Sequence, residues 1–128
     1  MGLKSKWVNP KFKNSEELVT YDIDNAWLHA LNEIGCPTIA LIIHHTPKSN
    51  RLHKIKEYEK QIPNLLERCE DIWLKWIKEF IALNNISISD IQSINYDAIT
   101  IKASVKITHE YINKNVKFDK ESTPNRYI

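Results

Sequence analysis

The sequence predicts a single α+β domain in which a long, kinked amphipathic helix and a shorter N-terminal helix pack on a small, mainly antiparallel sheet. Two patterns predict these elements: apolar residues recur at helical spacing over residues 52–83, and apolar and polar residues alternate over residues 99–107. The length of 128 residues fits one domain, and the 42% hydrophobic and 27% charged shares are ordinary for a globular protein. We expect a basic N-terminal arm (1–14), one domain (15–118) and a polar C-terminal tail (119–128).

The N-terminal arm differs in charge from the segment that follows it. Residues 1–13 contain four lysines and no acidic residue, whereas residues 14–34 contain five acidic residues and no lysine or arginine. Asn14 and Glu17 have the spacing of a capping box, which predicts a helix start near Ser15. The arm is expected to dock on the domain through its apolar side chains, Trp7, Val8 and Phe12.

The shorter helix is predicted between Ile23 and Ile34. Apolar residues recur there at intervals that place them on one helix face: Ile23, Ala26, Trp27, Ala30, Leu31 and Ile34. Either Asp22 or Asp24 is suited to cap the start, and Gly35 is suited to the left-handed position after the end. Residues 18–21 either extend this helix or form a short strand.

A continuous apolar run follows, from Thr38 to Ile43. It lies between Pro37 and the polar segment 44–47, and it is only six residues long. A short apolar run bounded by prolines is typical of a buried strand, so a strand is predicted here. Residues 48–50 are the expected turn after it.

The longest amphipathic pattern covers residues 52–83. Its apolar residues are separated alternately by three and four positions, so they occupy one face of a helix: Ile55, Tyr58, Ile62, Leu65, Cys69, Ile72 and Trp76. Pro63 lies inside this pattern. Because proline lacks an N–H donor and clashes with the preceding turn, the sequence predicts either a kink or a break into two helices there.

Two strands are predicted towards the C-terminus, after a short turn over residues 89–92. Apolar residues at every second position between Ile99 and Ile107 indicate an antiparallel strand with one face on the core. Val116 and Phe118 indicate another strand, which follows a turn over residues 113–115.

Several function classes lack their usual signatures. Only two glycines are present, and neither G-x-x-x-x-G-K nor G-x-G-x-x-G occurs. No uncharged run is long enough for a bilayer span, and no secretory pattern follows the N-terminus. Cys36 and Cys69 are isolated, without a C-x-x-C motif, and are expected to be free thiols. We therefore expect a cytoplasmic protein with no cofactor and no membrane partner.

The leading functional hypothesis is a small non-enzymatic binding protein, because no recognisable catalytic set assembles from the motifs. We expect it to occupy a surface of another macromolecule, as inhibitor, immunity and mobile-element accessory proteins do. Trp73, Trp76 and Phe80 lie on one side of the long helix and are the candidate partner-binding residues, although the same residues are suited to a core. The expected partner is another protein or a second copy of the chain.

An alternative hypothesis is nucleic-acid binding by the basic segment over residues 48–60. Five cationic side chains are candidates for anion or phosphate contacts: Lys48, Arg51, Lys54, Lys56 and Lys60. Tyr58 is the only aromatic residue in this segment that is available for base stacking. A solvated helix face, with Glu57 and Glu59 offsetting part of the charge, explains the same pattern.

A further alternative is a metal-dependent nuclease centred on Asp22 and Asp24. The segment Asp22-Ile23-Asp24-Asn25, followed by Ala30-Leu31-Asn32-Glu33-Ile34-Gly35, resembles the D-x-D-N and helix signature of RusA-type Holliday-junction resolvases. The resemblance covers about 14 residues and implies that the two carboxylates share a divalent cation. The lysine usual in that helix and the acidic pair that follows it are missing here. In the other interpretation, both aspartates are helix-capping acids.

His44 and His45, at the end of the predicted strand, are candidates for a general base because imidazole titrates near neutral pH. Adjacent strand residues point to opposite faces, so one metal ion bound by both rings is not expected. A polar strand end in solvent is the other interpretation.

Overall fold

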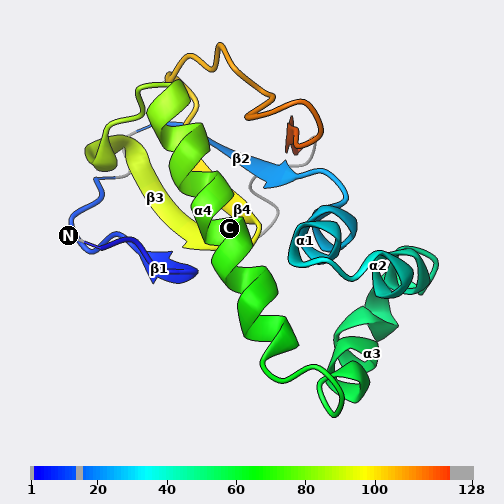
Figure 1. Cartoon of the computed structure of the whole chain (residues 1–128). Helices are drawn as coiled ribbons and strands as arrows, with labels where there is room; N and C mark the ends of the chain where they lie inside the picture. Colours follow the sequence, from blue (N-terminus) through cyan, green and yellow to red (C-terminus); the bar gives the residue numbers. More distant parts are fainter. Residues whose placement is uncertain (1, 14–15, 122–128) are drawn as a thin grey trace.

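Five antiparallel strands form one sheet, and the long helix α4 lies across one of its faces (Figure 1). The computed structural model describes residues 2–13 and 16–121, and it confirms the α+β fold class. The strand order is β1-β3-β4-β2-β5, with bounds Lys6–Val8, Ile91–Asn95, Ala98–Lys102, Leu18–Ile23 and Phe118–Lys120 in that order. The α-helices are α1 (Ala26–Ile34), α2 (Pro37–His44), α3 (Arg51–Tyr58) and α4 (Leu65–Leu83), and short 3₁₀ turns occupy Lys48–Asn50 and Ile88–Asp90.

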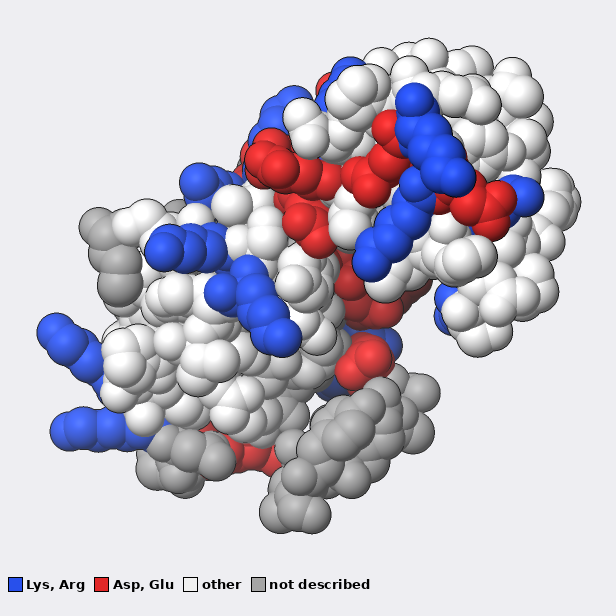
Figure 2. All heavy atoms as spheres, turned by 90° about the horizontal axis from the view of Figure 1, so that it is seen from below, with Lys and Arg blue, Asp and Glu red and all other residues white. Residues whose placement is uncertain are grey.

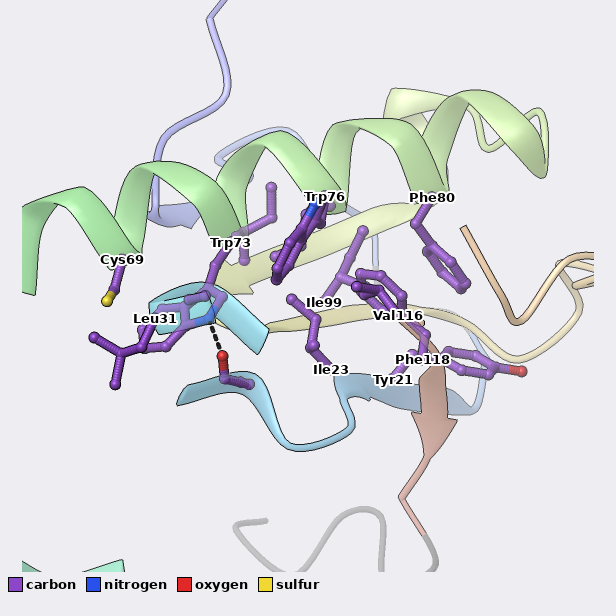
Figure 3. Packing of buried hydrophobic residues seen from close by; sticks show 14 of the residues in the cluster. Tyr21, Ile23, Leu31, Cys69, Trp73, Trp76, Phe80, Ile99, Val116 and Phe118 are labelled. Carbon is purple, nitrogen blue, oxygen red and sulfur yellow. Dashed lines mark hydrogen bonds between the residues drawn. The ribbon is translucent and has the colours of Figure 1, made fainter. Parts of the chain in front are cut away.

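The core lies between α4 and the sheet. Alternate residues of β2 and β4, two of the three interior strands, are buried, as a strand with one face on a core requires. Figure 3 shows Trp76 and Phe80 pointing from α4 towards the strands, whereas Trp73 points towards α1. The ring of Phe80 stacks on Phe118 of β5, with centroids 4.2 Å apart. This contact joins the long helix to the last strand of the sheet.

The pattern over residues 52–83 forms two helices, and the predicted disruption at Pro63 is confirmed as a break. α3 ends at Tyr58, and α4 begins at Leu65 after Asn64 adopts a left-handed conformation with φ of 62°. Because the first amides of a helix lack intrahelical acceptors, they need partners from outside. Glu59 supplies one, since its Oε2 accepts a hydrogen bond from the Leu66 N–H at 3.1 Å.

The strand predicted over residues 38–43 is wrong, because this segment is helix α2. Pro37 occupies the first turn of the helix, where the absent N–H donor would have no partner in any case. Only Ala40 and Ile43, three residues apart, are fully buried, whereas Leu41 and Ile42 are exposed. A continuous apolar run has no period, so it does not distinguish a buried strand from a helix.

The N-terminal segment contributes an edge strand. Lys6–Val8 pair with β3, and Trp7 lies opposite Ile94. The buried Asn9 side chain then donates to the carbonyls of Ile88 and Ile91 at 3.2 and 3.0 Å. The helix predicted near Ser15 is wrong: Asn14 and Ser15 lie outside the described residues, but residues 18–23 form strand β2.

The C-terminal strands are shorter than predicted. β4 ends at Lys102, and residues 103–107 leave the sheet. The predicted turn over residues 113–115 is confirmed, because Asn113 Oδ1 accepts hydrogen bonds from the amides of Asn115 and Val116 at 2.9 and 3.0 Å. β5 then pairs with β2, so Asp119 and Lys120, which were expected in the tail, belong to the sheet.

Candidate functional site

The three candidate partner-binding residues lie in the core. Trp73, Trp76 and Phe80 are 4%, 3% and 0% exposed. The Trp73 indole donates to the Ala26 carbonyl at 2.9 Å and meets the Trp27 ring edge-on at 4.7 Å, which attaches α1 to α4 (Figure 3). The burial of Trp73, Trp76 and Phe80 matches the core interpretation, and it leaves these three rings almost no surface for a partner.

Two of the five candidate phosphate-binding cations are engaged within the protein. Arg51 donates from Nε to the Thr46 carbonyl at 2.8 Å and from Nη2 to the His44 carbonyl at 3.0 Å. Its guanidinium thus satisfies carbonyls at and beyond the C-terminus of α2. Lys54 Nζ lies 3.9 Å from Glu57 Oε1 and 6.0 Å from the centroid of the Tyr58 ring.

The other three cations of this segment, Lys48, Lys56 and Lys60, are exposed. His53, on the same helix, lies 3.2 Å from Glu57 Oε2. Figure 2 shows lysine and arginine side chains interleaved with acidic ones on the face that it presents. A duplex-binding surface is usually a continuous basic stripe, and the charge on this face is mixed.

Asp22 and Asp24 do not converge on a metal. Asp22 lies on β2 directly opposite Asp119, whereas Asp24 is exposed in the turn before α1. Among residues 2–13 and 16–121, no group of three or more His, Cys, Asp or Glu side chains is placed to hold a metal ion. The capping interpretation also fails, because Asn25 is the N-cap of α1 and no side chain caps it by a hydrogen bond. The prediction for Gly35 is confirmed, with a φ of 96°.

The environment of Asp22 is nevertheless unusual. Burial, together with the charges of Asp97, Glu121 and Asp119, raises the pKa of its carboxyl to about 6. Asp97 lies in the turn between β3 and β4, and its carbonyl accepts from the Ile23 amide at 2.9 Å. Burial also raises the pKa of the Asp97 carboxyl. Carboxylates from three segments thus meet at one end of the sheet.

The remaining candidates from the sequence are two adjacent histidines and two free thiols. His44 and His45 lie at the end of α2, with ring centroids 5.4 Å apart. Cys36 and Cys69 are free thiols, and burial raises the pKa of Cys69 to about 12, which keeps that thiol protonated. Elsewhere on the exposed surface, the Thr108 hydroxyl lies 2.9 Å from Nδ1 of the adjacent His109.

The structure also exposes apolar residues that the sequence did not mark as functional. Leu41 and Ile42 on α2 are 57% and 38% exposed, and Leu52 on α3 is 47% exposed. The strand predicted over residues 38–43 placed Leu41 and Ile42 in the core. Their exposure becomes apparent only because the segment is a helix. The apolar run over residues 38–43 ends at two polar residues, His44 and His45. This ending fits a helix that terminates in solvent, and it is the sequence signal that could have indicated α2.

Comparisons with protein-family models, with curated proteins and with solved structures find no match to this chain. In the part of the chain that the structure describes, none of the helices combines the length and the apolar character that crossing a membrane requires.

Proposed function

We propose that this protein is a small non-enzymatic binding protein that occupies a surface of a partner protein, in the manner of inhibitor, immunity or mobile-element accessory proteins. The observation that carries the proposal is the exposure of Leu41, Ile42 and Leu52 on two consecutive helices. We call these residues the α2–α3 surface. Exposed aliphatic side chains on two neighbouring helices give a partner protein apolar surface to cover.

The position of the α2–α3 surface supports this role. α2 and α3 lie at one end of the molecule, beside α1 and away from the sheet (Figure 1). The two hydrogen bonds of Arg51 connect the start of α3 to the end of α2. A surface that is already ordered loses little conformational entropy on binding, which favours affinity.

The charge around these helices favours an acidic partner. Lys48 precedes α3, Lys56 lies on it, and Lys60 follows it, and all three are exposed. Cations beside an apolar contact accelerate association with an acidic surface more than they add to affinity. The proposed partner is therefore a protein whose apolar contact site has an acidic rim.

The test is a pull-down with the tagged full chain and with two matched double variants. Leu41→Ser with Leu52→Ser removes the α2–α3 surface, while Leu83→Ser with Ile88→Ser changes two exposed residues elsewhere. We expect the wild type and the second pair to retain one and the same protein, identified by mass spectrometry, and the first pair to lose it. The purified partner should then bind more slowly as salt rises, because screening weakens steering.

Three outcomes would overturn the proposal. The first is that the wild type retains no protein, or that both pairs behave alike. The second is a homodimer in light scattering that Leu41→Ser with Leu52→Ser converts to monomer, which would replace the partner by a second copy. The third is salt-dependent binding of DNA or RNA that Lys56→Gln abolishes, which would favour the nucleic-acid function instead.

A further inference from the structure

The two cysteine thiols come from different helices and lie close together. Cys36 is the N-cap residue of α2, and Cys69 lies on α4. Burial is the main cause that raises the pKa of the Cys69 thiol, and the charge of Cys36 is the second. Arg68 and Glu70, which flank Cys69 in the sequence, influence it less. Because a charge acts more strongly at short range, the Cys36 sulfur is a close neighbour of the Cys69 sulfur.

Backbone contacts hold the segment around Cys36 against α4. The Cys36 amide donates to the carbonyl of Leu31, near the end of α1, at 2.9 Å. Figure 3 shows the Cys69 sulfur pointing from α4 to the side on which Leu31 lies. One turn further along α4, the Trp73 indole attaches this helix to α1 by its hydrogen bond to a backbone carbonyl. The end of α1 and the start of α2 are therefore fixed beside Cys69.

The two thiols differ in their access to solvent. Cys36 is half-buried, so a small oxidant can reach it, whereas Cys69 is fully buried. Both are free thiols in the part of the chain that the structure describes. The whole of α2 and α3 lies between them in the sequence. A bond between the two sulfurs thus closes a loop that contains the α2–α3 surface.

We propose that Cys36 and Cys69 form a reversible disulfide when the protein meets hydrogen peroxide. The Cys36 sulfur attacks one peroxide oxygen, the O–O bond breaks, and Cys36 becomes a sulfenic acid as one water is released. The Cys69 sulfur then attacks the Cys36 sulfur, the S–O bond breaks, and a second water leaves as the S–S bond forms. Peroxide gains the two electrons that the two thiols lose. The proposal does not depend on the partner-binding function.

The disulfide restrains α2 and α3 relative to α4. Closing the loop over residues 37–68 removes conformational freedom from the unfolded chain, which raises the midpoint of thermal unfolding by about 10 °C. The thiolate is the attacking form of cysteine, and the buried Cys69 thiol is protonated at neutral pH. The second step is therefore the slower one, and dimedone should trap the sulfenic acid of Cys36 before the disulfide forms.

The experiment treats the full chain with hydrogen peroxide at pH 7, blocks the remaining thiols with N-ethylmaleimide in denaturant, and measures the mass. We expect a monomer that has lost about 2 Da, takes up no maleimide, and regains both thiols after treatment with dithiothreitol. Peptide mapping should find Cys36 linked to Cys69. Thermal unfolding of the oxidised and reduced chains then measures the shift in midpoint.

Cys36→Ser is the matched variant, because serine is a preferred N-cap residue and the start of α2 is retained. After peroxide, this variant should keep a Cys69 thiol that reacts with maleimide in denaturant, and its unfolding midpoint should not rise. The proposal is overturned if both wild-type thiols stay free at about 1 mM peroxide, if oxidation ends at a sulfinic acid, or if it links two chains. It is also overturned if the oxidised chain unfolds at no higher temperature than the reduced chain.

Discussion

Asp22 on β2 lies directly opposite Asp119 on β5, so two carboxylates face each other across an edge pair of the sheet. Like charges in this position destabilise a strand pair. Lys117 Nζ, 3.2 Å from Asp119 Oδ1, offsets part of the repulsion. The ring of Phe118 is buried and stacks on Phe80, and this packing holds β5 in place against the remaining repulsion.

Burial of the Asp22 carboxyl, together with the charges of Asp97, Glu121 and Asp119, predicts that Asp22→Asn stabilises the protein at pH 7. The pKa of Asp22 rises from 3.8 to about 6 on folding, so the folded state binds the proton more tightly than the unfolded chain does. Stability is therefore highest below about pH 4 and falls as the pH rises to about 6. Because the carboxyl is only partly buried, we expect a gain of about 1 kcal/mol at pH 7.

The measurement is urea unfolding of the wild type and of Asp22→Asn at pH 7 and at pH 4. The gain should vanish at pH 4, where the wild-type carboxyl is protonated in the folded state. Asp24→Asn, at an exposed position in the neighbouring turn, is the matched control and should lack the gain at pH 7. An equal gain at both pH values would show that ionisation of the Asp22 carboxyl is not its cause.

Phe80→Ala should destabilise the protein by about 3–5 kcal/mol, because it leaves a cavity between α4 and the sheet. The ring is fully buried and contacts both Phe118 and Tyr21, at centroid distances of 4.2 and 5.6 Å. Chemical unfolding measures the loss, with Leu83→Ala, at an exposed position on the same helix, as the control. A loss below about 1 kcal/mol would contradict a core role for Phe80.

Arg51→Gln should destabilise the α2–α3 connection by about 1–2 kcal/mol, since two carbonyls lose a charged donor. Native-state hydrogen exchange is the sharpest readout, because faster exchange should be confined to residues 37–58. Lys56→Gln removes an exposed charge on the same helix and should leave the exchange rates unchanged. Identical exchange in both variants would mean that the guanidinium does not hold the two helices together.

Asn84→Asp should cost about 2–3 kcal/mol although the two side chains have the same shape. The Asn84 amide nitrogen donates to the carbonyls of Phe80 and His109, at 2.9 and 3.0 Å, while its oxygen accepts from the amides of Thr108 and His109, at 2.8 Å each. Aspartate keeps the acceptor but places a second oxygen against two carbonyls. Thermal unfolding at pH 7 measures the loss, and Asn32→Asp, on the exposed face of α1, should be near neutral.

Sequence periodicity predicted the elements whose apolar residues all face one way. The helical spacing around Cys69 and Trp76 became α4, and the alternation from Ile99 became β4, because in each case burial follows the period. Pro63 marked the break between α3 and α4 for a local steric reason. The sequence did not predict helix α2, because its apolar residues Leu41 and Ile42 lie in solvent and the pattern assumes that apolar residues are buried.

The candidate site was harder to predict because it depends on contacts distant in sequence. The pairing of Asp22 with Asp119 requires that β5 joins β2. The aromatic residues of α4, for which the sequence left a partner-binding role and a core role open, are buried in the core. Their partners, such as Phe118, lie in segments whose position the sequence pattern leaves open.

The strand order has a consequence for how the chain folds during synthesis. β1 and β2 precede all four α-helices, yet both lie beside the hairpin of β3 and β4, which is made much later: Lys6 pairs with Asn95 and Leu18 with Lys102. Contacts of such large sequence separation slow folding. Until residues 91–102 leave the ribosome, the apolar face of α4 has no sheet to cover it, and the nascent chain is a natural client for chaperones.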